Sequence, residues 1–389
     1  PVRFRRSRTT GTRKQHVSIF DENASAPAPR RRMSRASLAG LWAVSFSLVA
    51  LLVLTIVPTS FVIQRPGPVY DTLGSVSSGD GERRPLISVE GAETFPTSGT
   101  LDLLTVEVLG NRERTPSWLE LAAAWFDPAR AVVPIDEIFP EGVTTEQRND
   151  ENAALMVDSQ KEATAAALSE LGYDVTSLVR VYRLADDSPA TGLLEPDDVI
   201  RSVDGEPVAT TAALRAAVNA AGGRPLSLDV DRAGEQRTVE VTPTQMTTDG
   251  ETRWVIGVTI AQDFDFPIDV TLQLDNVGGP SAGMMFALGI IDTLTPGELT
   301  GGERFAGTGT IDAEGNVGPI GGIRQKLYGA KDAGADWFLA PQRNCNEVVG
   351  HIPDGLRVFS VADLDDALSV VEAVSEGGDL DALPTCTAD

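Results

Sequence analysis

The stretch IDVTLQLDNVGGPSAGMMFALGIID (268–292) places a glycine-rich turn between a predicted strand and an apolar helix. The turn GGPSAG (278–283) puts Ser281 at or beside the start of that helix. Unpaired N–H groups at a helix start favour developing negative charge, and glycines let backbone amides approach a substrate carbonyl oxygen. Gly-Pro-Ser is also typical of a plain helix N-cap. The turn alone therefore leaves a catalytic and a capping role for Ser281 open.

A second glycine-rich segment follows, AGTGTIDAEGNVGPIGGIRQKLYGAKDAGADWFLAP (306–341), with Thr308 near its start and a predicted helix that carries Lys326. A nucleophilic serine needs a base. The chain has two histidines, His16 and His351. A membrane helix predicted at 36–63 would put His16 on the opposite side of the membrane from Ser281, so a histidine triad would depend on His351 alone. A lysine can serve instead when burial removes its charge.

These two segments resemble the proteolytic domain of the Lon family of serine peptidases. In that family a GPSAG turn holds the nucleophile and a following TG…G.V..IGG...K segment holds a lysine. The resemblance implies Ser281 as nucleophile and Lys326 as general base, 45 residues apart, with Thr308 as a hydroxyl that hydrogen-bonds the pair. It also implies the amides of Gly278, Gly279 and Ser281 as oxyanion donors. Many members carry an acidic residue three positions before the serine, where this chain has Gly278.

The same resemblance implies hydrolysis of peptide bonds in proteins. Lon proteases couple proteolysis to an ATPase, but no GxxxxGK[ST] phosphate loop occurs in this sequence. No HExxH motif or Cys/His cluster indicates a metal site. We therefore expect a serine endopeptidase that uses no ATP, metal or other cofactor, and whose activity rises toward mildly alkaline pH as the lysine loses its proton.

The run SPATGLLEPDDVIRSVDGEPV (188–208), followed by a predicted helix over 211–221, resembles the bacterial PDZ pattern. PDZ domains bind extended peptides by adding a strand to a sheet edge. No Gly-Leu-Gly-Phe-like loop stands before Val179. Capture of a terminal carboxylate, recognition of internal or misfolded segments, and a role as a simple spacer therefore all remain open.

Upstream, LISVEG (86–91) and LDLLTVEVLG (101–110) predict a β-hairpin, and helical spacing is found at 117–132 and 159–172. The stretch FPTSGTLDLLTVEV (95–108) looks like the opening strands of a Lon proteolytic domain. The resemblance thus implies an α/β (α+β) multidomain chain in which the PDZ-like domain is inserted into the protease fold.

A membrane span is predicted near the N-terminus. No charged side chain occurs between Arg35 and Arg65, and the core LAGLWAVSFSLVALLVLTIV (38–57) supplies the roughly 20 apolar residues that a spanning helix needs. A cleaved signal peptide is the alternative, but its apolar region runs only about 7 to 15 residues. Arginines at 30–32 and 35 place the N-terminus in the cytoplasm and the later domains outside. We expect a single-pass protein of the cell membrane.

The predicted segments are a basic disordered arm (1–35), the transmembrane helix (36–63), an extracytoplasmic region with the first protease strands (64–172), the PDZ domain (173–245), the Lon-type proteolytic domain (250–372) and a C-terminal tail (373–389). Translation from a site upstream of residue 1 and from Met33 are both compatible with the sequence.

The formal charge of −24 divides into +8 for residues 1–36 and −32 for the remainder. Such an acidic body repels nucleic acid, so we exclude that partner.

Cys345 and Cys386 are the only cysteines, and both lie on the predicted oxidising side of the membrane. A disulfide between them would tie the C-terminal tail to the protease domain, whereas the alternative is two separate thiols.

Protein or peptide substrates and the lipid bilayer are the expected partners, and the Lon resemblance implies a homo-hexamer. A PDZ scaffold with an inactive Lon-like domain, and a protease that cuts itself or one dedicated partner, remain alternatives.

Overall fold

The computed structural model describes residues 34–77, 81–248, 251–274 and 277–387, so most of the predicted basic arm lies outside the described residues. The chain divides into two compact units, 1–56 and 57–389. The first contains helix α1 (Arg35–Ile56), which has 22 residues and is long and apolar enough to cross a membrane. None of the side chains of α1 is buried.

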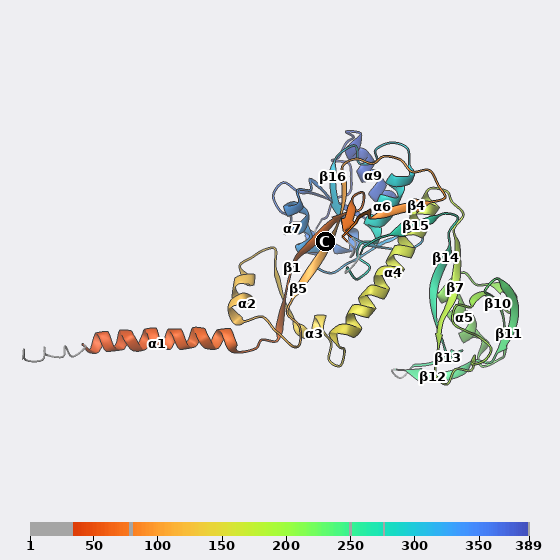
Figure 1. The fold of residues 1–389 in the computed structure, drawn as a ribbon, viewed down its shortest axis with the longest axis horizontal. Coiled ribbons are helices and arrows are strands. Elements are labelled where there is room, and N and C mark those ends of the chain that lie inside the picture. The colour runs from red at the N-terminus through yellow and green to blue at the C-terminus, as the bar shows by residue number, and fades with distance from the viewer. Residues whose placement is uncertain (1–33, 78–80, 249–250, 275–276, 388–389) are drawn as a thin grey trace, which may run out of the picture. The chain divides into compact units, whose positions relative to one another are not determined.

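The second unit is built on a sheet with the strand order β20-β19-β16-β5-β1-β6. Strands β5 and β19 run parallel to β16, β20 runs parallel to β19, and β1 is antiparallel to both of its neighbours. The strands are β1 (Phe61–Asp71), β5 (Thr100–Leu109), β6 (Ala131–Pro134), β16 (Arg304–Gly307), β19 (Trp337–Pro341) and β20 (Arg357–Val361). The sheet thus joins strands from both sides of the PDZ-like segment, so that segment is inserted into this domain (Figure 1).

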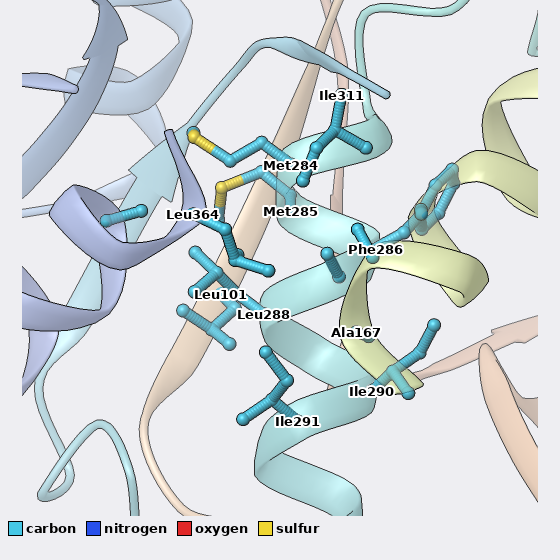
Figure 2. Packing of buried hydrophobic residues seen from close by; sticks show 14 of the residues in the cluster. Leu101, Ala167, Met284, Met285, Phe286, Leu288, Ile290, Ile291, Ile311 and Leu364 are labelled. Carbon is cyan, nitrogen blue, oxygen red and sulfur yellow. The ribbon is translucent and has the colours of Figure 1, made fainter. Parts of the chain in front are cut away.

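Helices cover both faces of this sheet. The mainly apolar helix α6 (Gly283–Leu294) packs between β5 and helices α4 (Thr145–Glu170) and α9 (Leu364–Ser375), as Figure 2 shows for Leu101, Ala167 and Leu364 around it. On the opposite face, helix α7 (Ile323–Ala333) buries Ile323 and Leu327 against Leu104 of β5. Burial on almost every side explains why α6 is apolar except at Asp292 and Thr293.

The inserted domain has the strand order β11-β10-β8-β7-β14, with β9 beside β8. Its elements are β7 (Thr176–Leu184), β8 (Val199–Val203), β9 (Glu206–Pro207), α5 (Thr211–Ala221), β10 (Leu226–Arg232), β11 (Glu235–Val241) and β14 (Val258–Asp265). Because β14 pairs with β7 along its whole length, the predicted boundary at 245–250 is too early. The hairpin of β12 (Thr244–Thr248) and β13 (Glu251–Val255) separates β14 from the rest of the pattern.

Three local predictions differ from the structure. The hairpin at 86–110 is wrong, because β4 (Ile87–Glu90) pairs with β15 (Asp269–Leu272) whereas β5 pairs with β1 and β16. The helix predicted over 117–132 ends early, as α2 (Trp118–Trp125), because Asp127 and Pro128 follow it. Helix α4 begins fourteen residues before the predicted start at Ser159, with a Thr144/Gln147 capping box that the sequence pattern already contained.

The remaining described elements are short. They are β2 (Ser75–Ser77), β3 (Arg83–Pro85), α3 (Ile135–Ile138), β17 (Thr310–Ile311), β18 (Val317–Gly318), the 3₁₀ turn η1 (Gln342–Asn344) and α8 (Cys345–Val348).

The C-terminal tail is fixed along β20. A disulfide joins Cys345 to Cys386, and the carbonyl of Pro384 accepts a hydrogen bond from the Ser360 amide. The Arg357 guanidinium donates to the Leu380 carbonyl as well. The structure therefore pairs the two cysteines and ties residues 380–386 to the domain that contains β20.

Removing this disulfide should destabilise the protein. The crosslink spans 41 residues, which corresponds to about 4 kcal/mol of unfolding free energy in the chain-entropy description. We expect Cys345→Ser/Cys386→Ser to unfold at a lower denaturant midpoint than wild type, measured by circular dichroism without reductant. Reductant should lower the wild-type midpoint and leave that of the double variant unchanged. Equal midpoints for both proteins without reductant would contradict the prediction.

Candidate active site

Ser281 lies in the turn that precedes α6. Its carbonyl oxygen accepts hydrogen bonds from the Gly309 amide at 3.0 Å and from the Thr308 hydroxyl at 2.8 Å. The N-cap residue of α6 is Ala282, and no side chain caps that helix. Ser281 therefore does not cap α6, and its hydroxyl points elsewhere.

The side chain of Lys326 reaches this hydroxyl from helix α7. Lys326 Nζ lies 2.7 Å from Ser281 Oγ and 2.8 Å from Thr308 Oγ1. Thr308 follows directly on β16, so the end of a central strand, the turn before α6 and the first turns of α7 meet at one point. Three residues that the sequence analysis singled out are thus brought together.

Burial determines the charge state of the lysine. Lys326 is only 2% exposed, and this desolvation lowers its pKa from 10.5 to about 7. Thr308 is fully buried beside it. The two groups within hydrogen-bond distance of Nζ are hydroxyls rather than carboxylates. A large fraction of Lys326 is therefore neutral near neutral pH and able to accept a proton.

His351 does not take part in this arrangement. Its ring lies 3.2 Å from the carbonyl of Val349, and it does not line the pocket at Ser281. The histidine alternative for the base therefore finds no support in the structure.

A pocket of about 430 Å³ opens beside Ser281 and Lys326. Its walls come from residues 103–107 of β5, from Tyr70 of β1, from Met156 of α4 and from the turn that holds Ser281. A second pocket, of about 920 Å³, runs along α4 and shares Val106, Met156, Val277 and Gly278 with the first. The two pockets therefore adjoin each other beside the turn that holds Ser281.

The edge of β5 faces this space. Strand β16 pairs with β5 only from Thr100 to Leu103, so among the described pairings residues 104–109 have a partner on one side alone, in β1. Exposed backbone N–H and C=O groups of a strand edge can pair with an added strand.

The glycine turn shows which amides are available. The Gly279 amide donates to the Asn152 carbonyl of α4 at 2.8 Å, so in this conformation it is not a free oxyanion donor, contrary to the expectation for Gly279. For the amides of Gly278 and Ser281, no acceptor occurs within the described ranges. A Cβ atom at Gly278 would lie 2.7 Å from Asn152 Cβ, so α4 leaves no room for the acidic side chain that many Lon proteases have there.

Two residues that position the site carried no recognisable sequence signal. The Ser159 hydroxyl of α4 donates to the Pro280 carbonyl at 3.0 Å, next to Ser281. Buried Asn344 binds both backbone groups of Ile320, with its oxygen 2.9 Å from the amide and its nitrogen 2.9 Å from the carbonyl. Asn344 thereby fixes the loop that leads into α7 and hence Lys326.

Asn344→Ala should lower activity without touching the reacting atoms. The substitution leaves the Ile320 amide and carbonyl without these partners, which costs about 1–3 kcal/mol and loosens the entry to α7. We expect hydrolysis that depends on Ser281 to fall about tenfold, mainly in kcat, because misplacement of a catalytic group acts on the chemical step. Asn316→Ala is the matched control, because exposed Asn316 bonds through its side chain to Asp312. Equal kcat for the two variants would contradict the prediction.

Comparison with known proteins agrees with this picture. The Lon protease (S16) C-terminal proteolytic domain matches residues 265–373, and the PDZ domain matches residues 142–242. The Lon protease of Lachnoclostridium phytofermentans is 36% identical over 93 residues, covering 23% of this chain and 11% of that protein. The Lon protease of Rickettsia felis is 33% identical over 110 residues, covering 28% of this chain and 14% of that protein. The chain therefore spans a small part of these relatives.

Among solved structures, the PDZ domain of an SdrC-like protein from Listeria monocytogenes is 20% identical, covers 21% of this chain and 85% of that one, and has a TM-score of 0.20. A solution structure from Geobacillus thermodenitrificans is 25% identical and has a TM-score of 0.19. The match covers 21% of this chain and 94% of that one.

The matched domains define a serine peptidase. More particularly, the chain carries a Lon-type proteolytic domain combined with a PDZ domain. The predicted fold class, with a PDZ-like β-rich domain inserted in a Lon-type domain, is confirmed.

Proposed function

We propose that this protein is a membrane-anchored, ATP-independent serine endopeptidase, with Ser281 as nucleophile and Lys326 as general base, that hydrolyses extracytoplasmic proteins. The observation that carries the proposal is the 2.7 Å contact between Ser281 Oγ and a buried lysine whose pKa is lowered to about 7. A neutral lysine at this distance accepts the serine proton at neutral pH, as in other Ser-Lys variants of the catalytic triad.

The chemistry proceeds in two steps. Lys326 Nζ takes the Ser281 proton while Oγ attacks the scissile carbonyl carbon, and the proton then passes from Nζ to the leaving amine. Water, activated by the same nitrogen, attacks the acyl-enzyme and releases the acid. The amides of Gly278 and Ser281, which have no acceptor among the described residues, are the proposed donors to the oxyanion. Thr308 holds Nζ in place through its hydroxyl, which also donates to the Ser281 carbonyl.

Substrate binding follows from the pockets and the β5 edge. A segment laid along residues 104–107 pairs its backbone with β5 and passes Ser281, while its side chains enter the two adjoining pockets. In the PDZ-like sheet, β14 is an edge strand beside α5, which permits strand addition there as well. We propose that this edge presents substrates to the protease domain.

The anchor and the disulfide support the proposed location. Helix α1 suits a single membrane span, and a disulfide between Cys345 and Cys386 is typical of an oxidising compartment. The proposed arrangement has the N-terminus in the cytoplasm and the protease and PDZ domains outside the membrane.

The test is hydrolysis of casein by the full chain in detergent micelles, without ATP or added metal. Wild type should produce fragments, whereas Ser281→Ala should produce none and should keep the wild-type circular dichroism spectrum. Fragments from both proteins at equal rates would show that Ser281 is not the nucleophile. No cleavage by wild type, of casein or of itself, would instead support the inactive scaffold.

A further inference from the structure

Helix α2 (Trp118–Trp125) exposes large apolar side chains. Trp125 is 74% exposed and Phe126, which ends the helix, is 89% exposed, and Trp118 and Leu119 are exposed as well. Tryptophan and phenylalanine at such exposure lose favourable burial, so a patch of them marks an interaction surface.

The apolar residues surround the helix. Leu121 and Ala124 face inward and pack with Ile63 of β1. At 100° per residue, the side opposite this pair carries Leu119, Ala122, Ala123 and Phe126, with Trp118 and Trp125 along one flank. A surface helix normally carries polar residues there, and a helix that is apolar all round is typical of a protein core or a membrane.

The one charged residue within α2 does not disturb this face. The Glu120 carboxylate accepts hydrogen bonds from the amide and the hydroxyl of Ser117, which close the capping box at the start of the helix. These bonds lower the pKa of Glu120. The carboxylate is therefore held at the N-terminal end, away from Trp125 and Phe126.

Hydrogen bonds tie the start of α2 to the chain that leaves α1. The Thr59 hydroxyl donates to the Pro116 carbonyl at 2.8 Å, and the Thr59 amide donates to the Thr115 hydroxyl at 3.2 Å. Only Val57 and Pro58 separate Thr59 from Ile56, the last residue of α1. Three peptide units reach about 11 Å at most, so the covalent chain keeps α2 close to the point where α1 ends.

We propose that α2 lies in the outer lipid–water interface of the membrane that α1 crosses, with Leu119, Trp125 and Phe126 among the acyl chains and headgroups. This inference rests on the proposed membrane anchor. Interfacial helices of this kind bury one apolar face, and tryptophan is enriched at that depth. Residues 47–57 at the end of α1 contain no aromatic residue, so α2 supplies the aromatic anchor on that side.

Such an anchor keeps the active-site pocket near the membrane. Arg65 of β1 binds Glu107 of the pocket wall at 3.0 Å, and it lies four residues along the strand from Phe61, about 13 Å. The nine residues from Ile56 to Arg65 span at most about 32 Å when fully extended, so the covalent chain tethers this pocket wall to the end of α1. Substrates favoured by this geometry are membrane-bound proteins and chains that emerge from the same membrane.

The experiment measures the environment of residue 126 in the full chain. Phe126→Cys carries a nitroxide label in lipid nanodiscs, and its collision rates with oxygen, which enters lipid, and with a water-soluble nickel complex are recorded. The native cysteines form a disulfide and do not react with the label. Tyr182→Cys, at a side chain 70% exposed on the PDZ-like domain, is the control for water, and Leu48→Cys in α1 is the control for lipid.

We expect the label at 126 to resemble that at 48, with oxygen access raised and nickel access several-fold lower than at 182. Nickel access equal to that at 182 would overturn the proposal, because the helix would then face water. Low access to both reagents would also overturn it, because protein, such as a second copy, would cover the face. A water-like label at 48 would show that the anchor itself is wrong, and casein cleavage is read separately on each variant.

Discussion

Lys326→Met should lower kcat/KM for casein-derived peptides at pH 8 by about three orders of magnitude, the usual size of a general-base effect. Methionine fits the buried, apolar surroundings of Lys326 and cannot accept a proton. The variant should fold, because it removes an amine that burial disfavours. Ser281→Ala should cause a loss of similar size.

The matched control is Lys331→Met on the same helix. Lys331 Nζ bonds to the Gly355 carbonyl, and its side chain lies outside the pocket, so this variant should keep wild-type activity. The double variant Ser281→Ala/Lys326→Met should be no slower than either single variant, because residues that act as one unit are not additive. A multiplied loss in the double variant, or an active Lys326→Met, would contradict a shared role.

The sequence predicted the pair of residues but not what holds it. Ser281 and Lys326 stand in two glycine-bearing motifs 45 residues apart, and the resemblance of these motifs to the Lon proteolytic domain implied that the two residues act together. Asn344 could not be found this way, because its role depends on a long-range contact with Ile320 that leaves no local pattern. The bond from Gly279 to Asn152 was missed for the same reason, since α4 reaches the turn only in three dimensions.

Strand predictions failed where pairing is non-local. The strand character of residues 87–90 and 100–109 was correct, but adjacency in sequence suggested a hairpin, whereas the partner of β4 is β15, far along the chain. At α2, helical spacing in the sequence did not show which side chains are buried. Only Leu121 and Ala124 are, because strands β1 and β6 cover one side of the helix.

The pH dependence of hydrolysis should follow the protonation of Lys326. Because burial lowers its pKa to about 7, kcat/KM should be level above that pH and fall about tenfold per unit below it, or roughly 100-fold between pH 8 and pH 5. A steady-state profile over this range measures the effect. A profile that is flat between about pH 5 and 9 would exclude a lysine base with this pKa.

The carboxyl group of Glu162 has a pKa in the same range, so its effect on the pH–rate profile must be distinguished from that of Lys326. Burial, together with the nearby carboxylates of Asp158, Asp312 and Glu314, raises the pKa of Glu162 to about 7. Glu162→Gln removes this group. We expect its pH–rate profile to match that of wild type, whereas a profile that becomes flat would assign the titration to Glu162.

The pH dependence of the free energy of unfolding has opposite signs for Lys326 and Glu162, so it distinguishes the two groups. A lysine pKa lowered by folding means that, between about pH 7 and 10.5, the unfolded chain holds a proton that the folded chain lacks, so stability rises with pH by up to about 5 kcal/mol. A raised carboxyl pKa acts oppositely, and Glu162 makes stability fall as pH rises from 4.5 to about 7. Lys326→Met should therefore gain most over wild type below pH 7, with the gain shrinking toward pH 10. A gain that is constant with pH in denaturant titrations would show that Lys326 is not buried as an amine of lowered pKa, and the base assignment would fail with it.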